Sequence, residues 1–318
     1  MNRSAKPLMA ALAAATLLGA ATPPSAGSSA EQVQEILVIG RRSGVPMWTI
    51  RGPETTIVLV GAIEGVSKTT QWSPDALTEA LGKADRVMFP QSHALTVGSP
   101  FKLIGWLAKW KAMGNLPKGQ TLGQLVSAGH LHRLAALEAR GLAPGNYEGR
   151  HPLHLANDLR DRAKGKVEYG RNAAEYVQKA VKKHKLAVAV DPIAKSKAKP
   201  VVKDLFASEP QEHVQCLVDS IALAEAGPAA VQARSDAWAR RRVAEVLASP
   251  ADKVYSSCWP AGADIFMAPN ELLAQMRQLL ADKQVIMAVL GLRTLGGTSG
   301  LLDRLQAAGF EIEGPDWK

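Results

Sequence analysis

The sequence predicts an α/β protein with a mixed, mostly parallel sheet built from both chain ends and a large helical insertion at about 100–250. Three observations predict this class. Short β-rich runs follow one another before residue 100, helical periodicity dominates the middle, and a strand, helix, strand order recurs near the C-terminus. A strand joined through a helix to another strand is typical of parallel pairing. We expect residues 31–318 to form a single domain, with the insertion packed over one side of the sheet.

Four apolar runs near the N-terminus indicate strands, because they are rich in β-branched residues and separated by turns or by a helical pattern. The expected strands are 36–39, 47–50, 56–60 and 86–89. The helix between the last two begins at Ser73, which can cap it, and ends near Ala84. Leu77 and Leu81 lie four residues apart and share its buried face. We expect the strands on either side of this helix to form a parallel pair.

The middle of the chain is helical at about 100–184 and again at about 210–247, with an interruption near Gly227 and Pro228. One strand, at 186–190, is expected between these stretches. The second strand, helix, strand unit is expected at 285–292, 300–308 and 310–312.

The first 30 residues have the layout of a signal peptide. Arg3 and Lys6 precede the apolar run Leu8–Ala21, and small residues and prolines follow it. The run has about 14 residues, whereas a membrane-spanning helix needs roughly 20. We therefore expect cleavage within about 21–30, a periplasmic or secreted protein, and no transmembrane anchor after cleavage.

The two cysteines, Cys216 and Cys258, both lie in the last third of the chain. In an oxidising compartment an even pair favours a disulfide bond, with two buried free thiols as the alternative. A lone pair at this separation is not a zinc signature, which needs four ligands in close couples.

The composition, with 47% apolar and 21% charged residues, excludes disordered and collagen-like classes. The formal net charge is +9, and lysines gather at 182–185 and 195–199. These stretches lack the interleaved aromatic residues on which single-strand nucleic-acid binders stack bases, and export removes most nucleic acid from reach. We expect no nucleic-acid partner and a solvated basic face. A weaker alternative is that this face meets an anionic lipid or polysaccharide of the cell envelope.

Ligand sites in parallel α/β sheets form beyond the carboxyl ends of the strands, so the loops that follow the predicted strands are the first candidates. Three loops stand out, at 61–65, 90–93 and 291–300. The third is rich in glycine, and its backbone N–H groups with Arg293, Thr298 and Ser299 would suit an anion. The alternative is that its glycines only permit a tight turn.

Five segments together resemble the TraB/GumN family, which includes the Tiki metalloproteases. They are Pro46-x-Trp48, the strand into Gly61-Ala62-Ile63-Glu64, Trp72-Ser73-Pro74, Ala84-Asp85-Arg86-Val87 and the closing stretch 291–309. The resemblance covers about residues 44–315. It implies the motifs of that family: Gly-x-x-His after an early strand, Glu at the end of the next strand, and a second Gly-x-x-His before a Gly-Leu-Leu helix. In the Tiki branch these residues form a metal-dependent peptidase site.

The chain departs from this pattern at each position. Glu64 stands where the first histidine is expected, Pro90 where the glutamate is expected, and Thr294 where the second histidine is expected. The family's upstream Arg-Asn pair corresponds to Pro269-Asn270, which keeps only the asparagine. A hydrolytic metal site needs about three imidazole or carboxylate ligands and an open position for water. One carboxylate will not hold a catalytic ion, so we expect no metal and no cofactor.

The sequence therefore indicates an exported pseudoenzyme that binds an unidentified small ligand, peptide or envelope component. The predicted ligand-binding residues are Gly61, Glu64, Gly291, Arg293, Thr294, Thr298 and Ser299. The alternative function is a divergent metal-dependent hydrolase or peptidase in which Glu64 and His93 hold a divalent transition metal. The simpler interpretation is that His93 is an exposed loop residue and Glu64 pairs with Arg293 across the cleft.

One further group has metal-ligand spacing. His151, His154 and Asp158 fall on one side of an expected helix. A polar outer face that begins near Pro152 explains these residues equally well.

Overall fold

The computed structural model describes residues 44–52, 54–90, 93–184, 189–191, 194–258, 269–281 and 283–318. These residues all belong to one compact unit, Gly40–Lys318. The expected signal segment at 1–30 and the expected strand at 36–39 lie outside the described residues.

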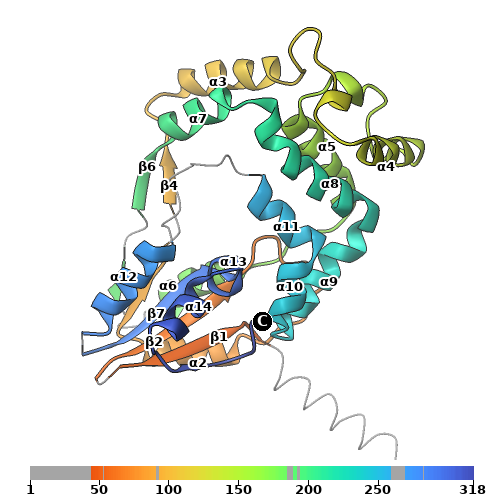
Figure 1. The fold of residues 1–318 in the computed structure, drawn as a ribbon. Coiled ribbons are helices and arrows are strands. Elements are labelled where there is room, and N and C mark those ends of the chain that lie inside the picture. The colour runs from red at the N-terminus through yellow and green to blue at the C-terminus, as the bar shows by residue number, and fades with distance from the viewer. Residues whose placement is uncertain are drawn as a thin grey trace, which may run out of the picture. The chain divides into compact units, whose positions relative to one another are not determined.

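A six-stranded sheet forms the centre of this unit (Figure 1). Its strand order is β5-β3-β7-β2-β1-β8, with β2 and β3 parallel to β7, β5 parallel to β3, and β1 antiparallel to both β2 and β8. The strands are β1 Met47–Arg51, β2 Thr56–Ala62, β3 Arg86–Met88, β5 Ala189–Val190, β7 Val285–Gly291 and β8 Ile312–Glu313. The predicted mixed, mostly parallel α/β sheet from both chain ends is therefore confirmed.

The expected parallel pair is not formed, because β7 lies between β2 and β3. Each residue of β2, from Thr56 to Ala62, pairs with a residue of β7, from Val285 to Gly291. Five consecutive residues of β7, from Ile286 to Leu290, are buried. A strand that is apolar on both faces belongs in the centre of a parallel sheet, where helices cover both sides. Strand β7 thus lies where chain order alone would predict direct pairing between β2 and β3.

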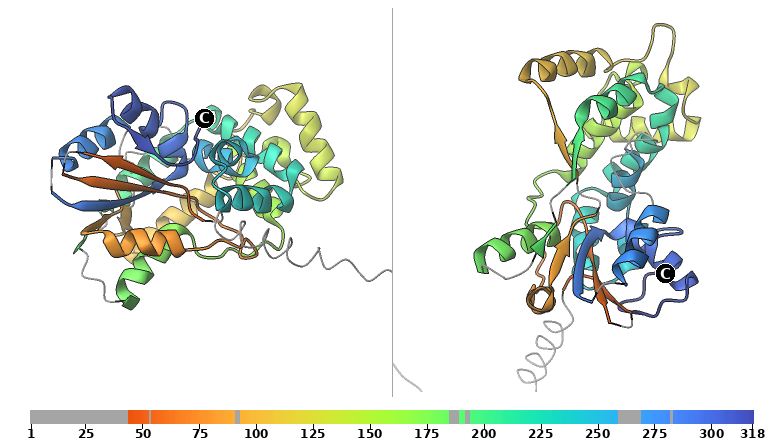
Figure 2. Two further views of the ribbon diagram at one scale, coloured as in Figure 1. Left: turned by 90° about the horizontal axis from the view of Figure 1, so that it is seen from below. Right: turned by 90° about the vertical axis from the view of Figure 1, so that its left-hand side faces the viewer.

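Helices cover both faces of this sheet, with α2 and α6 on one face and α12, α13 and α14 on the other (Figure 2). Their bounds are α2 Asp75–Lys83, α6 Ala173–His184, α12 Pro269–Leu279, α13 Leu292–Gly296 and α14 Leu301–Ala307. The predicted helix after Ser73 is confirmed as α2, and its residues Leu77 and Leu81 are buried as expected.

The remaining helices come from the predicted insertion. They are α3 Pro100–Ala112, α4 Ala128–Ala139, α5 Pro152–Lys164, α7 Ala198–Ala207, α8 Val214–Ala226, α9 Pro228–Ala239, α10 Val243–Ala248 and α11 Pro250–Ser257. The predicted interruption near residue 227 is confirmed, since Gly227 has φ 65° and separates α8 from α9. A small parallel sheet, β4 His93–Thr96 with β6 Ala194–Lys197, was not predicted.

Buried residues form two clusters. The first lies around the sheet and includes Trp48, Ile57 and, from α9, Trp238. The second lies among the helices of the insertion and includes Leu155 of α5 and Leu217 of α8. The predicted cysteine pair joins α8 to the residue after α11 at the edge of this second cluster, with the Sγ atoms of Cys216 and Cys258 2.04 Å apart.

Within the described ranges, no single helix is long and apolar enough to cross a membrane. The pair Pro210–Ala226 and Pro228–Ala239 meets the criterion by length and composition only, and it is bent by 95°. Both helices contribute residues to the second buried cluster.

Candidate functional site

Glu64, Pro90 and Thr294 replace the family's metal-binding residues, and each of them follows one of three neighbouring strands. Glu64 lies two residues after β2, Pro90 two residues after β3, and Thr294 three residues after β7. Since β7 pairs in parallel with both β2 and β3, all three loops leave the same edge of the sheet. This is the edge at which parallel sheets place their ligand sites.

Gly61, near the end of β2, lies in close contact with buried side chains. Its carbonyl oxygen accepts a hydrogen bond of 2.8 Å from Nε1 of the buried Trp238. A Cβ at this position would lie 2.6 Å from Leu292 and 3.1 Å from Trp48. Glycine is therefore required because two buried side chains, those of Leu292 and Trp48, pack against its Cα.

The next residues, Glu64 and Gly65, form the floor of a pocket. The Glu64 carbonyl oxygen accepts a 2.6 Å hydrogen bond from Nη1 of Arg234, and Oε2 of its exposed carboxylate accepts one of 3.3 Å from Nδ2 of Asn172. Gly65 has φ 66°, and a Cβ there would lie 2.6 Å from the Tyr255 hydroxyl and 3.2 Å from the Tyr169 ring. Two tyrosine rings thus close over the loop that follows β2.

A cluster of charged side chains fixes the loop that contains Glu64 and Gly65, through the hydrogen bond from Arg234. Asp252, at the start of α11, accepts hydrogen bonds on Oδ1 from Nε and Nη2 of Arg234 and on Oδ2 from Nε and Nη2 of Arg293. The side chains of Arg234 and Asp252 are 2% and 6% exposed. The expected pair between Glu64 and Arg293 is therefore wrong, because Asp252 takes both Nε and Nη2 of Arg293 and a third bond from this guanidinium goes to the Leu247 carbonyl.

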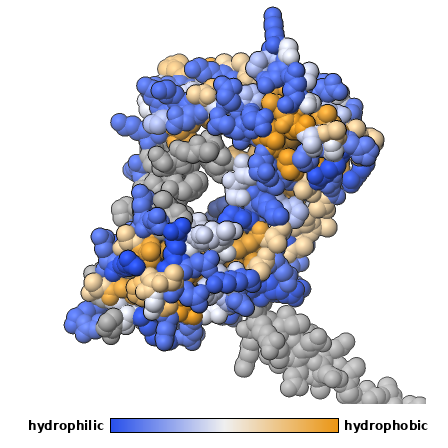
Figure 3. Space-filling view, in the orientation of Figure 1, coloured by the Kyte–Doolittle hydropathy of each residue, from blue (hydrophilic) through white to orange (hydrophobic). Residues whose placement is uncertain are grey.

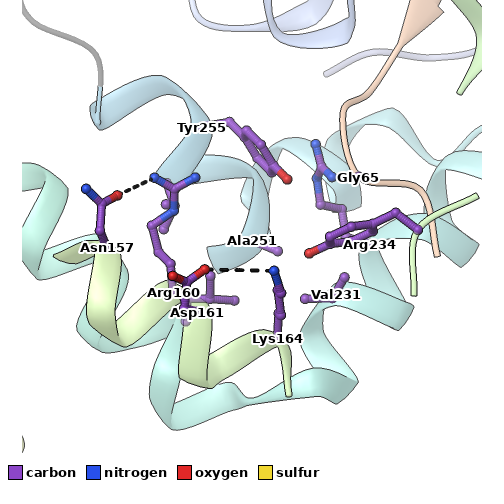
Figure 4. Close-up of a pocket in the computed structure, with 12 residues that line it drawn as sticks. Gly65, Asn157, Arg160, Asp161, Lys164, Val231, Arg234, Ala251 and Tyr255 are labelled. Carbon is purple, nitrogen blue, oxygen red and sulfur yellow. Dashed lines mark hydrogen bonds and ion pairs between the residues drawn. The ribbon is translucent and has the colours of Figure 1, made fainter. Parts of the chain in front are cut away.

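The pocket above this cluster has a volume of about 230 Å³ (Figure 4). Its polar wall comes from α5 and contains Asn157, Arg160, Asp161 and Lys164. The Arg160 guanidinium lies 5.8 Å from the centroid of the Tyr255 ring and donates a 3.2 Å hydrogen bond to Oδ1 of Asn157. Within the part of the chain that the structure describes, Arg160 has no carboxylate partner.

A larger pocket of about 730 Å³ adjoins the first and shares Gly65, Asn157, Arg160, Tyr169, Val254 and Tyr255 with it. It adds the carboxylates of Glu64 and Glu175 and an apolar wall that contains Trp110, Leu153 and Leu205. Burial and the neighbouring Tyr255 raise the pKa of Tyr169, so its hydroxyl stays protonated at neutral pH. Together the two pockets form a cleft with a cationic end and an apolar wall, which we call the Arg160 cleft.

Of the seven predicted ligand-binding residues, only Glu64 lines the Arg160 cleft. The glycine-rich loop is tightly folded: a Cβ on Gly297 would overlap the Arg293 carbonyl oxygen, and one on Gly300 would lie 2.5 Å from the Leu295 carbonyl oxygen. Ser299 has φ 55°, and its carbonyl oxygen accepts a hydrogen bond from Arg304. The geometry favours the interpretation that these glycines permit a tight turn. The other predicted residues, Gly61, Gly291, Thr294 and Thr298, line neither pocket.

The alternative site at Glu64 and His93 required their strands to be neighbours. The strand that precedes residue 90, β3, is separated from β2 by β7. His93 itself begins β4, which pairs with β6 in a separate sheet. The His93 side chain lies outside the described residues.

Sequence reasoning missed Asn172, because its contact with Glu64 spans 108 residues. Asn172 lies just before α6, and its Nδ2 donates the hydrogen bond to Oε2 of Glu64. Asn270, the asparagine kept from the family's Arg-Asn pair, accepts a hydrogen bond on Oδ1 from Nη1 of Arg304. The Oδ1 of Asn172 also accepts from the Glu175 N–H and so caps the first turn of α6.

The predicted group His151, His154 and Asp158 does not converge on one point. The Nδ1 of the buried His151 accepts a hydrogen bond from the Leu153 N–H at the start of α5. The His154 ring stacks 4.0 Å from Trp110, and Asp158 pairs with Arg150. In the described residues, no group of three or more His, Cys, Asp or Glu side chains is placed to hold a metal ion.

The side chains at the three positions where the family has its metal ligands do not fit the transition metal that the resemblance implies. Glu64 offers one carboxylate, which Asn172 already contacts. Pro90 has no donor atom in its side chain, and Thr294 offers only a neutral hydroxyl. These three side chains cannot supply the three strong ligands of a hydrolytic centre.

Replacing Gly65 with alanine is expected to lower the free energy of unfolding by about 1–2 kcal/mol, because a Cβ is strained at positive φ. The same substitution at Gly82 is the matched control. That glycine lies inside α2 with open space around it, so alanine should stabilise by about 0.5–1 kcal/mol. Urea unfolding of both variants measures the change in the free energy of unfolding, which should be a decrease for Gly65→Ala and an increase for Gly82→Ala. Equal effects at the two positions would contradict the assigned strain.

A comparison with family sequence models finds that the model of the TraB/PrgY/gumN family matches residues 46–314. No curated protein and no solved structure matches the chain. The match confirms the resemblance drawn from the five sequence segments.

Proposed function

The chain belongs to the TraB/PrgY/gumN family, and on that premise we propose that it is an exported ligand-binding protein without metal-dependent hydrolase activity. It acts in the periplasm or outside the cell, as the signal layout of residues 1–30 predicts. Its ligand binds in the Arg160 cleft. Support for the loss of hydrolase chemistry comes from the donor set, in which Glu64 is the one strong ligand among three inherited positions.

The observation that carries the binding proposal is the position of Arg160. Its guanidinium borders both pockets and lies against an aromatic ring, and no described carboxylate neutralises it. Lys164 adds a second cation at the same end, where it lies 3.8 Å from Asp161. A guanidinium in this setting binds a carboxylate or phosphate strongly, because its donors form charge-assisted hydrogen bonds.

The rest of the cleft suggests what else the ligand carries. The Tyr169 and Tyr255 hydroxyls and the Asn157 amide offer hydrogen bonds, while Trp110, Leu153 and Leu205 offer an apolar wall. Pockets that bind small molecules combine such an apolar lining with a few polar groups that fix orientation. We propose a ligand with one anionic group and one apolar part, such as the carboxyl end of a short peptide.

A peptide screen tests this proposal. Short peptides with a free terminal carboxylate are compared with the same peptides as terminal amides, by fluorescence or calorimetric titration. We expect binding to require the carboxylate and Arg160→Gln to weaken it about 10- to 100-fold, the range of one charge-assisted hydrogen bond. Arg162→Gln is the matched control, because Arg162 lies on the same helix and its Nη1 bonds the Gly141 carbonyl outside the cleft. Equal effects of the two substitutions would exclude the Arg160 cleft as the site.

Metal analysis separates this function from the alternative hydrolase. The protein is purified without a histidine tag, and zinc, manganese and cobalt are measured in parent, Glu64→Gln and His93→Gln proteins. We expect no stoichiometric metal in any of them. Stoichiometric metal that both substitutions remove would establish the hydrolase with Glu64 and His93 and refute the proposal.

A further inference from the structure

The surface around α3 exposes an unusual number of large apolar side chains. Among the described residues, seven large hydrophobic side chains are exposed, and five of them lie in the eleven residues from 97 to 107. They are Val97, Phe101, Leu103, Ile104 and Leu107. Monomeric proteins rarely leave such residues contiguous unless they meet a partner or a membrane.

Three of these exposed residues occupy the outward side of the helix. Phe101, Ile104 and Leu107 recur every three residues and are 80%, 67% and 68% exposed, so they share one face. Trp106 and Trp110 are half-buried on the other side, where Trp110 stacks on His154. The helix is thus anchored to the protein by one face and presents a bare apolar face to its surroundings. In the space-filling view, hydrophobic residues interrupt the mainly hydrophilic edge along which α3 runs (Figure 3).

Positive charge surrounds this apolar face. Lys102, Lys109 and Lys111 lie on α3 itself, and residues 97–113 contain no acidic residue. The neighbouring β6 and α7 contribute four more exposed lysines: Lys195, Lys197, Lys199 and Lys203. In the described ranges none of these seven lysines forms an ion pair.

We propose that this α3 surface, made of α3 with the lysines of β6 and α7, binds the headgroup region of an anionic phospholipid bilayer. The helix has 13 residues and so a length of about 20 Å, short of the roughly 30 Å hydrocarbon core. It lies in the plane of the interface, with Phe101, Ile104 and Leu107 inserted among the acyl chains. The lysines meet the lipid phosphates. An apolar face with basic flanks is typical of helices that bind membranes in this way.

The positive charge of the α3 surface favours an anionic bilayer over a second copy of the chain as its partner. Two copies that met through α3 would bring their seven lysines together, and such like-charge contacts oppose association. An anionic bilayer provides the complementary charge. This inference does not depend on the proposed function, since the α3 surface and the cationic end of the Arg160 cleft use different residues.

Vesicle co-sedimentation of residues 31–318, which include the whole compact unit from Gly40 to Lys318, tests the proposal. Vesicles of phosphatidylcholine with about 30% phosphatidylglycerol are compared with phosphatidylcholine alone. We expect at least about tenfold stronger binding to the acidic vesicles, and loss of most of that binding between about 50 mM and about 500 mM NaCl. The double variant Ile104→Ser/Leu107→Ser should bind about tenfold more weakly while its melting temperature stays that of the parent, because both side chains are exposed.

Charge reversal supplies the matched control. Lys102→Glu/Lys109→Glu should weaken binding about 100-fold, whereas Lys182→Glu/Lys183→Glu, the same charge change on exposed lysines of α6, should weaken it by less than about threefold. Equal losses in the two double variants, or equal binding to neutral and acidic vesicles, would overturn the proposal. So would a dimer in solution that Ile104→Ser/Leu107→Ser dissociates, because a second copy would then cover the face.

Discussion

Replacing Asp252 with asparagine is expected to lower the free energy of unfolding by about 3–5 kcal/mol. The Asp252 carboxylate is 6% exposed and accepts hydrogen bonds from two guanidinium groups, one of which, on Arg234, is itself 2% exposed. The amide would leave both positive charges close together without a counter-charge, and its NH₂ group would face donors. The midpoint and slope of urea unfolding, followed by tryptophan fluorescence, measure the loss.

Glu168→Gln is the matched control, because it also converts a carboxylate into an amide within an ion pair. The Lys68–Glu168 pair is exposed, so its loss should cost less than about 1 kcal/mol. If the two substitutions destabilise equally, Asp252 does not neutralise the buried arginines. A second readout comes from Arg234→Met in the Asp252→Asn protein, which removes one unpaired charge and should restore part of the stability.

Stability is expected to fall by about 2 kcal/mol between pH 7.5 and pH 5 through His151 alone. The side chain is buried, with the His213 and His154 rings 5.4 Å and 6.2 Å from its own. Burial and these two imidazoles lower the pKa of His151 from 6.5 to about 4. Between these values the unfolded chain binds a proton that the folded chain excludes, so acid favours unfolding. The contribution is present above about pH 6.5 and is lost as the pH falls toward 4.

His151→Asn isolates this contribution, because asparagine can still cap α5 but does not titrate. Urea unfolding at both pH values should show that the variant loses about 2 kcal/mol less than the parent. Burial also lowers the pKa values of His154 and His213, so a residual loss in the same direction should remain. His132→Asn, at an exposed position on α4, is the control. The same pH dependence in parent, control and His151→Asn would refute the assignment.

The strands with continuous apolar runs could be predicted from the sequence. β2 and β7 are such runs, and both were expected close to their actual bounds. The place of β7 between β2 and β3 could not be predicted, because it depends on pairing between residues more than 200 positions apart. The small sheet of β4 and β6 was missed because Lys195 and Lys197 in β6 give no apolar pattern. Local signals predict elements, whereas the order of strands follows from burial in the whole chain.

Only part of the site had a local signal. Glu64 could be identified because it follows an apolar strand, whereas its partner Asn172 lies 108 residues further along the chain and carries no local signal. Arg234 and Asp252 lie on helices in sequences that resemble ordinary polar surface, yet both are buried. Their role depends on one contact across 18 residues and another across 41. No periodicity or motif encodes such contacts.

The central position of β7 also affects how the chain can fold while it is being synthesised on the ribosome. β2 ends at Ala62 and β7 begins at Val285, and synthesis of the residues between them takes roughly 10–45 s at elongation rates of about 5–20 residues per second. Once β3 has been made as well, β2 and β3 both have an edge that only the missing β7 can pair with. The emerging polypeptide therefore stays incompletely folded until translation is nearly finished, which leaves a long period for chaperones to engage it.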